Sequence, residues 1–164
     1  MTRITDPSLA AAAEAELPWL QRYIPLTRRV AADLSRTTLR DRHIGLNVHL
    51  GIKMVPVVEA LIQTGAQVVV LGCNPHTTRD SVAALMAARG AEVYAWAGMT
   101  EAERQEGFRW ALSQECEFVS EMGGELLEAA VREGSASRQK LQAGMEATGS
   151  GILRLQALPL PVPV

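Results

Sequence analysis

The sequence contains little cysteine, few aromatic residues and no long apolar run. Its two cysteines, Cys73 and Cys116, lie far apart and in no CxxC or histidine-rich spacing, which argues against a disulfide framework and against a zinc site. No apolar run approaches the roughly 20 residues of a membrane-spanning helix, and residues 1–16 lack the basic-then-apolar order of a signal peptide. We expect a cytoplasmic protein with reduced thiols, no metal and no membrane partner.

The sequence also lacks an excess of charge of either sign. The formal net charge is −2 over 164 residues, and lysine and arginine are scattered among aspartate and glutamate. Proteins that bind a phosphate backbone usually carry an extended basic stripe, so we do not expect nucleic acid as a partner. The length suits one compact domain, and a hydrophobic content of 48% suffices for a substantial core.

Short apolar runs alternate with amphipathic segments along most of the chain. This alternation is typical of βαβ units in a parallel sheet. We therefore predict an α/β domain over residues 37–157, a three-layer Rossmann-like or flavodoxin-like sheet with helices on both faces. The expected strands are residues 43–50, 67–71, 92–96 and 118–120, and the expected helices are residues 54–64, 79–89, 101–114 and 125–133. Gly65 and Gly90 each stand between the end of a predicted helix and the start of the next predicted strand. This shared position predicts α-to-β turns.

The two ends of the chain differ from this pattern. Residues 1–36 are predicted to be a helical segment, since an alanine-rich run precedes apolar residues at helical spacing, with Pro18 and Pro25 as breaks. Residues 158–164 are apolar and rich in proline, and they cannot form a regular helix. This tail has two interpretations: a linker or docking segment, or a tail that lies on the surface of its own domain.

Polar residues cluster where the predicted strands end. In open parallel sheets, ligands bind in the crevice beyond the carboxyl ends of the strands. His49 follows the first strand, residues 73–80 (CNPHTTRD) follow the second, and the pair Gly123-Gly124 follows the fourth. We expect a ligand site at this edge of the sheet.

Five short segments and the glycine pair form a recognisable series in this order and spacing. The segments are residues 47–50 (NVHL), 65–68 (GAQV), 73–80 (CNPHTTRD), 93–100 (VYAWAGMT) and 145–152 (MEATGSGI). Together they resemble the S-adenosylhomocysteine hydrolase family, over about residues 39–155. The resemblance implies the fold of that family's substrate-binding domain.

The resemblance also implies the chemistry of the family. There, bound NAD oxidises the ribose 3′-hydroxyl, the adjacent acidified proton is removed, and homocysteine leaves; a hydride acceptor is indispensable to that reaction. No GxGxxG stretch follows a predicted strand here, and the family's catalytic lysine and aspartate would lie beyond Val164. We therefore expect a stand-alone, NAD-independent domain with no cofactor, unless the chain is a fragment of a full-length adenosylhomocysteinase.

Departures from the family pattern indicate an altered site. Met122 stands where the resemblance places a catalytic aspartate, and Ala147 where it places a catalytic glutamate. Gly51 replaces the threonine that follows the family's histidine, and Lys53 replaces a glutamate that helps to recognise adenine. Two catalytic carboxylates of the family are therefore absent.

The candidate catalytic residues are His49, Lys53 and Glu121. At a strand end, His49 is placed to give or take a proton, and the family uses the matching histidine in its pocket; the alternative is a histidine capped by a loop. Lys53 would suit a carboxylate or phosphate, unless it is a solvated lysine in a first helical turn. Glu121, beside the glycine turn, is either a base or a solvated loop carboxylate.

The candidate ligand-binding residues are Asn74, His76, Thr77, Thr78 and Gly123. Thr77 or Thr78 is a candidate helix N-cap beside backbone N–H groups that attract anions, although the cluster could also serve capping alone. His76 stands where the family has an aromatic residue, so it is either a surface residue or a new functional group. Gly123 permits close approach of the backbone to a ligand.

Three functions remain open from the sequence. The chain could be a repurposed enzyme that applies acid–base or addition–elimination chemistry to a small polar or anionic metabolite, such as a nucleoside or an S-adenosyl compound. It could instead bind such a metabolite without catalysis, or dock as a subunit of a larger enzyme complex. Apolar surface left where a larger domain packs in the family predicts a homodimer or a heteromeric complex.

Overall fold

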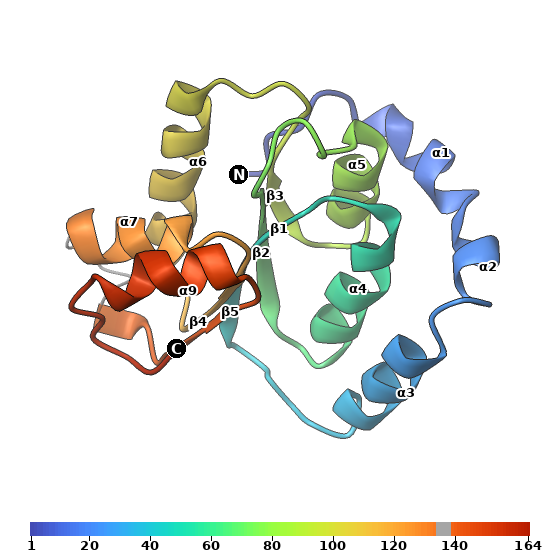
Figure 1. Ribbon diagram of the computed structural model, residues 1–164. Coiled ribbons are helices and arrows are strands. Elements are labelled where there is room, and N and C mark those ends of the chain that lie inside the picture. The colour runs from blue at the N-terminus through green and yellow to red at the C-terminus, as the bar shows by residue number, and fades with distance from the viewer. Residues whose placement is uncertain (134–138) are drawn as a thin grey trace.

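The structure, a computed structural model, describes residues 1–133 and 139–164. In these residues, five parallel strands form one sheet in the order β3-β2-β1-β4-β5 (Figure 1). The strands are β1 (His43–Val48), β2 (Gln67–Gly72), β3 (Glu92–Tyr94), β4 (Phe118–Glu121) and β5 (Ala143–Glu146). The predicted α/β class with a parallel sheet is confirmed, and β5 is a strand that the sequence pattern did not indicate.

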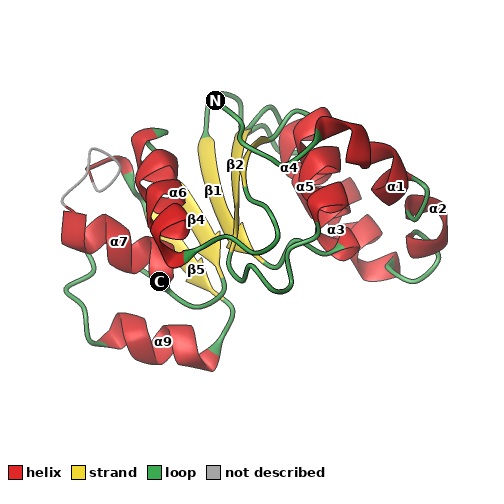
Figure 2. Cartoon of the chain, turned by 90° about the horizontal axis from the view of Figure 1, so that it is seen from above, coloured by secondary structure: helices red, strands yellow, loops and turns green. Residues whose placement is uncertain are grey.

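Helices cover both faces of the sheet (Figure 2). One face carries α4 (Val55–Gln63) and α5 (Asp80–Ala88), and outside them lie α1 (Ala10–Glu14), α2 (Leu17–Leu20) and α3 (Pro25–Leu34). The other face carries α6 (Glu101–Ser113), α7 (Glu125–Glu133) and α9 (Gly149–Gln156). Short 3-10 turns form η1 (Pro7–Leu9) and η2 (Ile52–Met54). Within the described ranges, none of these helices has both the length and the hydrophobicity of a membrane-spanning segment.

Alternate residues of the strands enter two separate cores. The central strands β1 and β2 are buried on both faces, which is why their sequences read as nearly continuous apolar runs. Leu46 and Val70 belong to the first core, under α4 and α5, whereas Val69 and Val119 belong to the second, under α6 and α7. Burying one such side chain contributes about 1.5–3 kcal/mol, so the sheet is stabilised from both sides.

Local signals set the ends of several helices. Gly65 and Gly90 follow α4 and α5 with φ values of 90° and 102°, a backbone conformation that glycine adopts without steric cost. The predicted α-to-β turns are therefore confirmed. Helix α6 begins with a capping box, in which Thr100 Oγ1 accepts the Glu103 N–H (3.3 Å) and the Glu103 carboxylate accepts the Thr100 N–H (2.8 Å).

The predicted N-terminal helical segment is confirmed as α1, α2 and α3, and the stretch around Arg3 that precedes it is extended. This stretch lies beside β3, where the Arg3 N–H donates to the Val93 carbonyl (2.7 Å) and the Ala95 N–H donates to the Arg3 carbonyl (3.2 Å). Thr2, Ile4 and Thr5 are β-branched, which suits this extended conformation.

The apolar tail lies on its own domain. Leu158, Leu160 and Val162 pack against the second core, and the Gly144 N–H on β5 donates to the Pro163 carbonyl (2.9 Å). Of the two interpretations of residues 158–164, the structure therefore shows the second, a tail on the surface of its own domain.

Candidate functional site

The strand order reverses at β1, because β2 and β3 lie on one side of it and β4 and β5 on the other. Ligands of open parallel sheets bind next to such a reversal, outside the carboxyl ends of the strands. The candidate residues therefore divide into two groups, one that follows β1 and β2 and one that follows β4 and β5.

His49 follows β1 and is exposed. Its Nδ1 atom lies 2.6 Å from Oγ1 of Thr77, which is also exposed. The same hydroxyl lies 3.2 Å from the carbonyl oxygen of Asn74. These bonds orient the imidazole and leave Nε2 as the ring nitrogen that a ligand can meet, as acid or base depending on the tautomer.

Lys53 is exposed on η2, in the turn that follows β1 and His49. The loop after β1 therefore contributes an ammonium group and an imidazole to the same end of the sheet. An exposed ammonium can pair with an anionic group of a ligand without a large desolvation penalty.

The loop after β2 is held by hydrogen bonds within itself. The His76 N–H donates to Asn74 Oδ1 (2.9 Å), and the Thr78 hydroxyl donates to the Asn74 carbonyl (3.0 Å). A Cβ atom at Gly72 would stand 2.6 Å from the hydroxyl oxygen of Thr78. Glycine at the end of β2 therefore makes room for the buried Thr78.

Helix α5 begins after Arg79, whose own side chain makes no capping bond. The hypothesis that Thr77 or Thr78 caps this helix is wrong, because both hydroxyls bond to the loop instead. The first residue of α5, Asp80, accepts the Ala97 N–H (2.7 Å) and so ties the loop after β3 to the loop after β2.

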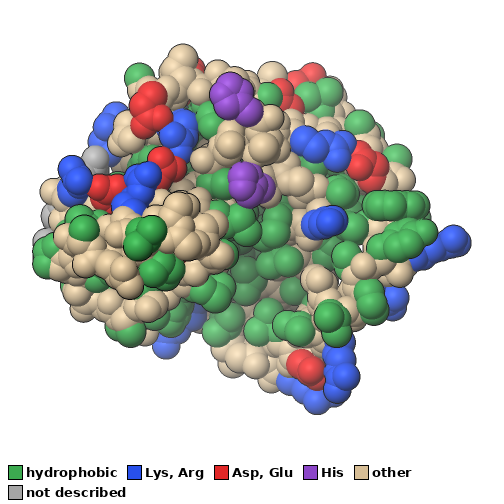
Figure 3. Space-filling view, in the orientation of Figure 1, with side chains coloured by type: hydrophobic (Ala, Val, Ile, Leu, Met, Phe, Trp, Pro, Cys, Tyr) green, Lys and Arg blue, Asp and Glu red, His purple; other side chains and the backbone are tan. Residues whose placement is uncertain are grey.

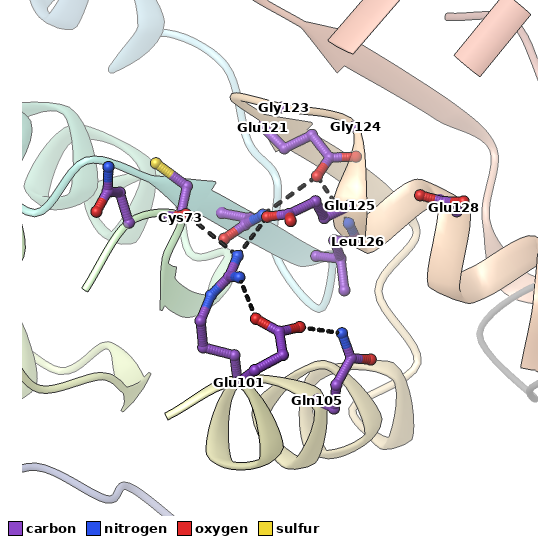
Figure 4. Close-up of polar contacts among 12 residues, drawn as sticks. Cys73, Glu101, Gln105, Glu121, Gly123, Gly124, Glu125, Leu126 and Glu128 are labelled. Atoms are coloured by element: carbon purple, nitrogen blue, oxygen red, sulfur yellow. Dashed lines mark hydrogen bonds and ion pairs between the residues drawn. The ribbon is translucent and has the colours of Figure 1, made fainter. Parts of the chain in front are cut away.

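Glu121, the last residue of β4, is fully buried. Its carboxylate accepts the N–H group of Leu126 (2.8 Å) in the first turn of α7 (Figure 4). It also accepts the N–H group of Leu127 (2.9 Å) and the amide of Asn47 on β1 (3.2 Å). Burial raises the pKa of Glu121, although these hydrogen bonds act in the opposite direction. The interpretation of Glu121 as a solvated loop carboxylate is wrong, because the side chain is buried; its role as a base stays a prediction.

Glu146, the last residue of β5, organises the glycine turn after β4. Its carboxylate accepts the N–H groups of Gly123 (3.1 Å), Gly124 (2.8 Å) and Thr148 (2.6 Å), and the Thr148 hydroxyl (2.7 Å). Burial raises the pKa of Glu146, but the bonds from Thr148 and the two glycines outweigh it, so the net shift is downward. The N–H of Gly123, a residue predicted to lie close to a ligand, is therefore bonded to Glu146.

Arg104 of α6 crosses to the loops after β2 and β4. Its guanidinium donates to Glu101 (2.7 Å), to the Cys73 carbonyl (3.2 Å) and to Glu125 (Figure 4). These groups border a hollow of about 370 Å³ whose lining also includes Asn74, Pro75, His76 and Met99. Burial, followed by the charge of Glu125, raises the pKa of the Cys73 thiol to about 11, so this thiol stays protonated near neutral pH.

The structure thus separates residues that the sequence grouped together. Asn74 and His76 line one hollow, His49 and Thr77 bond beside it, and Glu121 lies beneath the site in the second core. Sequence reasoning missed Glu146 and Arg104. The Glu101 and Arg104 pair at helical i, i+3 spacing was a weak signal for the latter.

The glycine turn after β4 does not offer a site for a pyrophosphate. The glycine pair after β4 has its N–H groups bonded to Glu146, so they cannot also cradle a pyrophosphate. No group of three or more His, Cys, Asp or Glu side chains in residues 1–133 and 139–164 is arranged to hold a metal ion.

Known relatives align with this chain over most of its length. The family described as S-adenosyl-L-homocysteine hydrolase matches residues 3–155. An S-inosyl-L-homocysteine hydrolase of Methanococcus maripaludis is 32% identical over 159 residues, which cover 96% of this chain and 38% of the relative. An adenosylhomocysteinase of Sulfolobus acidocaldarius is 32% identical over 157 residues (95% and 37%), and one of Thermotoga maritima is 32% identical over 146 residues (88% and 36%).

The chain therefore spans less than two fifths of the length of these relatives. The family match covers nearly all of it, and the parallel sheet agrees with the fold that the resemblance implied. The chain belongs to the S-adenosyl-L-homocysteine hydrolase family.

Proposed function

We propose that this domain binds a nucleoside or an S-adenosyl compound at the carboxyl ends of β1 and β2, and that it does so without NAD. The observation that carries the proposal is the exposed His49–Thr77 pair next to the strand reversal. The names of the relatives refer to S-inosyl- and S-adenosylhomocysteine, and a ribose or base edge offers the hydroxyl and nitrogen groups that such a pair can bond.

The side chains around this pair suit a polar ligand with an anionic part. Asn74 and His76 line the adjacent hollow, and exposed Lys53 supplies positive charge. Any catalysis by these groups is acid–base or addition–elimination chemistry, in which Nε2 of His49 gives or takes a proton at the ligand. The altered positions Met122 and Ala147 favour binding over the family reaction.

Titration calorimetry with S-adenosylhomocysteine, adenosine, inosine and homocysteine tests the proposal. We expect at least one of the nucleosides to bind, Thr77→Val and His49→Gln to weaken that binding about tenfold, and Lys53→Ala to weaken binding of an anionic ligand. Thr2→Val is a matched control, because Thr2 bonds to Glu92 at the far edge of the sheet. Absence of binding across the panel, or unchanged affinity in Thr77→Val, would contradict the assignment.

A second candidate function is that of the substrate-binding part of an NAD-dependent hydrolase. This candidate is favoured because the chain spans less than two fifths of the length of each relative. Homocysteine release from S-adenosylhomocysteine, measured with NAD and with the remaining part of the Thermotoga maritima relative supplied as a separate chain, distinguishes the two candidates. We expect no release above the buffer control, and measurable release would support the second candidate.

A further inference from the structure

Arg104 of α6 connects two loops of the ligand edge. Its guanidinium donates to the Cys73 carbonyl (3.2 Å) in the loop after β2, to Glu125 at the start of α7, and to Glu101 one turn earlier in α6 (2.7 Å). Long cationic side chains usually keep their head group in water, whereas the side chain of Arg104 is only 12% exposed. The arginine is therefore part of the packed structure around the site.

Stability alone does not explain why this guanidinium is buried. Its Nε atom is buried and has no hydrogen-bond partner among the described residues, and a buried donor without an acceptor destabilises a fold. The Phe108 ring lies on another side, with its centroid 5.5 Å from the guanidinium carbon. A functional role is one reason for which a native protein keeps such an unsatisfied group.

The bond from Arg104 matters because the loop after β2 has few other anchors. In the described part of the chain, Arg104 is the only residue outside the loop whose side chain bonds to the backbone of residues 73–78. The remaining bonds from outside join backbone groups, such as the Gly98 N–H and the Pro75 carbonyl (3.3 Å). Loss of the guanidinium should therefore free the loop at the Cys73 carbonyl.

This loop also fixes the imidazole of His49. Asn74 follows Cys73, and its carbonyl accepts the Thr77 hydroxyl (3.2 Å). A hydroxyl has one proton to donate, so Thr77 Oγ1 is then left to accept a bond from Nδ1 of His49, 2.6 Å away. In this arrangement neutral His49 carries its proton on Nδ1, and Nε2 offers a lone pair to a ligand.

We propose that Arg104 is a positioning residue of the ligand site. It holds the loop after β2 so that the Asn74 carbonyl takes the Thr77 proton, which keeps neutral His49 in the Nδ1-protonated form. The inference rests on the proposed binding of a ligand at His49 and Thr77, and it adds a requirement. The ligand group that meets Nε2 donates a hydrogen bond, as a ribose hydroxyl does.

The same loop places a second imidazole. The His76 N–H donates to Asn74 Oδ1 (2.9 Å), and both residues line, with Arg104, the hollow of about 370 Å³. Figure 3 shows histidine side chains (purple) at the surface of this face, and His49 and His76 are both exposed. A displaced loop would therefore alter the hollow and both imidazoles.

NMR of the imidazole nitrogens in the isotope-labelled full chain tests the inference without a ligand. At about pH 9, where histidine is neutral, we expect His49 to be protonated on Nδ1 in the unaltered protein and to interconvert between both neutral forms in Arg104→Met. Methionine keeps an apolar stem beside Phe108 but cannot donate to the Cys73 carbonyl. Arg104→Lys, which keeps a donor, should restore the Nδ1 form. Arg109→Ala, at an exposed position of the same helix, is the matched control.

Calorimetry with a nucleoside that binds the unaltered protein gives the second measurement. We expect about tenfold weaker binding in Arg104→Met, and nearly unaltered binding in Arg104→Lys and Arg109→Ala. An arginine with a merely structural role would lower the melting temperature in Arg104→Met and leave the tautomer of His49 unchanged. Circular dichroism verifies that each variant folds, and Arg104→Leu takes the place of Arg104→Met if the latter unfolds.

Two results would overturn the inference. One is a neutral His49 protonated on Nε2 in the unaltered protein, and the other is a tautomer of His49 that Arg104→Met leaves unchanged. Neither result depends on a ligand, so a failure of the proposed function is seen separately. If Arg104→Met changes the tautomer but no nucleoside binds the unaltered protein, the positioning role of Arg104 stands and the proposed function fails.

Discussion

The two halves of the ligand edge use their polar groups differently. Beyond β4 and β5, the carboxylates of Glu121 and Glu146 accept bonds from backbone N–H groups of the domain itself. Beyond β1 and β2, His49 bonds to Thr77 while both remain exposed, and Lys53 is exposed as well. A group whose bonds are all internal supports the fold, whereas an exposed group remains available to a ligand. Changes in the first half should therefore lower stability, and changes in the second should alter binding.

Glu121→Ala should have the largest effect on the free energy of unfolding. It leaves two N–H groups of α7 and the Asn47 amide without their acceptor in the core. Each buried unsatisfied group costs about 1–3 kcal/mol, so we expect a loss of about 3 kcal/mol or more in urea unfolding. Glu92→Ala removes an exposed pair with the N-terminus and should cost less than about 1 kcal/mol. Equal losses would contradict a structural role for Glu121.

Gly151→Ala should have the next largest effect. A Cβ atom at Gly151 would overlap the Glu146 carboxyl group, which must then release the glycine turn after β4. We expect a loss of about 2 kcal/mol. Gly149→Ala in the same helix has open space around the added Cβ, and it should be neutral or stabilising by up to about 1 kcal/mol. If both variants unfold equally easily, the turn does not depend on Glu146.

Stability should depend on pH with opposite signs for these two carboxylates. The pKa of Glu121 is raised above its ordinary value of 4.5, so its contribution is lost as the pH rises from that value through the folded pKa. The pKa of Glu146 is lowered, so its contribution is present above 4.5 and lost as the pH falls through the folded pKa.

Thermal unfolding from about pH 3 to about pH 8 measures both effects. Glu121→Gln should remove the decline in melting temperature on the alkaline side. Glu146→Gln should remove the decline in melting temperature on the acid side. A profile of Glu121→Gln parallel to that of the unaltered protein would show that Glu121 is not the group responsible.

Thr77→Val should have the smallest effect on stability. Thr77 and its partner His49 are exposed, and surface substitutions usually change the free energy of unfolding by less than about 0.5 kcal/mol. The affinity for a nucleoside should nevertheless fall about tenfold. A loss of stability comparable to that of Gly151→Ala would remove the distinction between the two halves.

Most of the fold could be predicted because its signals are local. The apolar runs of β1 and β2 and the glycines after α4 and α5 each act over a few residues. Strand β5 was missed because Ala143–Glu146 contains no β-branched residue and is not fully buried. Its neighbours in the sheet, rather than its own propensity, make it a strand.

The site was harder to predict because it depends on the direction of single side chains. Glu121, the last residue of its strand, could equally point to solvent, and only the packed structure shows it buried opposite Asn47 and against the start of α7. Glu146 was missed because it ends β5, the strand that the sequence pattern did not indicate. Arg104 belongs to a helix whose pattern looks solvated, and its contacts with Cys73 and Glu125 bridge residues 31 and 21 positions away.

The stretch around Arg3 is synthesised long before β3, the strand with which it pairs. The Arg3 guanidinium donates to the Tyr94 hydroxyl across a separation of 91 residues, and contacts this distant in sequence form slowly. At a synthesis rate of about 5–20 residues per second, the segment waits at least several seconds for β3 to emerge. Until then the extended stretch around Arg3 has no strand of its own chain to pair with and can pair with another nascent chain, so crowding of ribosomes on one message favours aggregation.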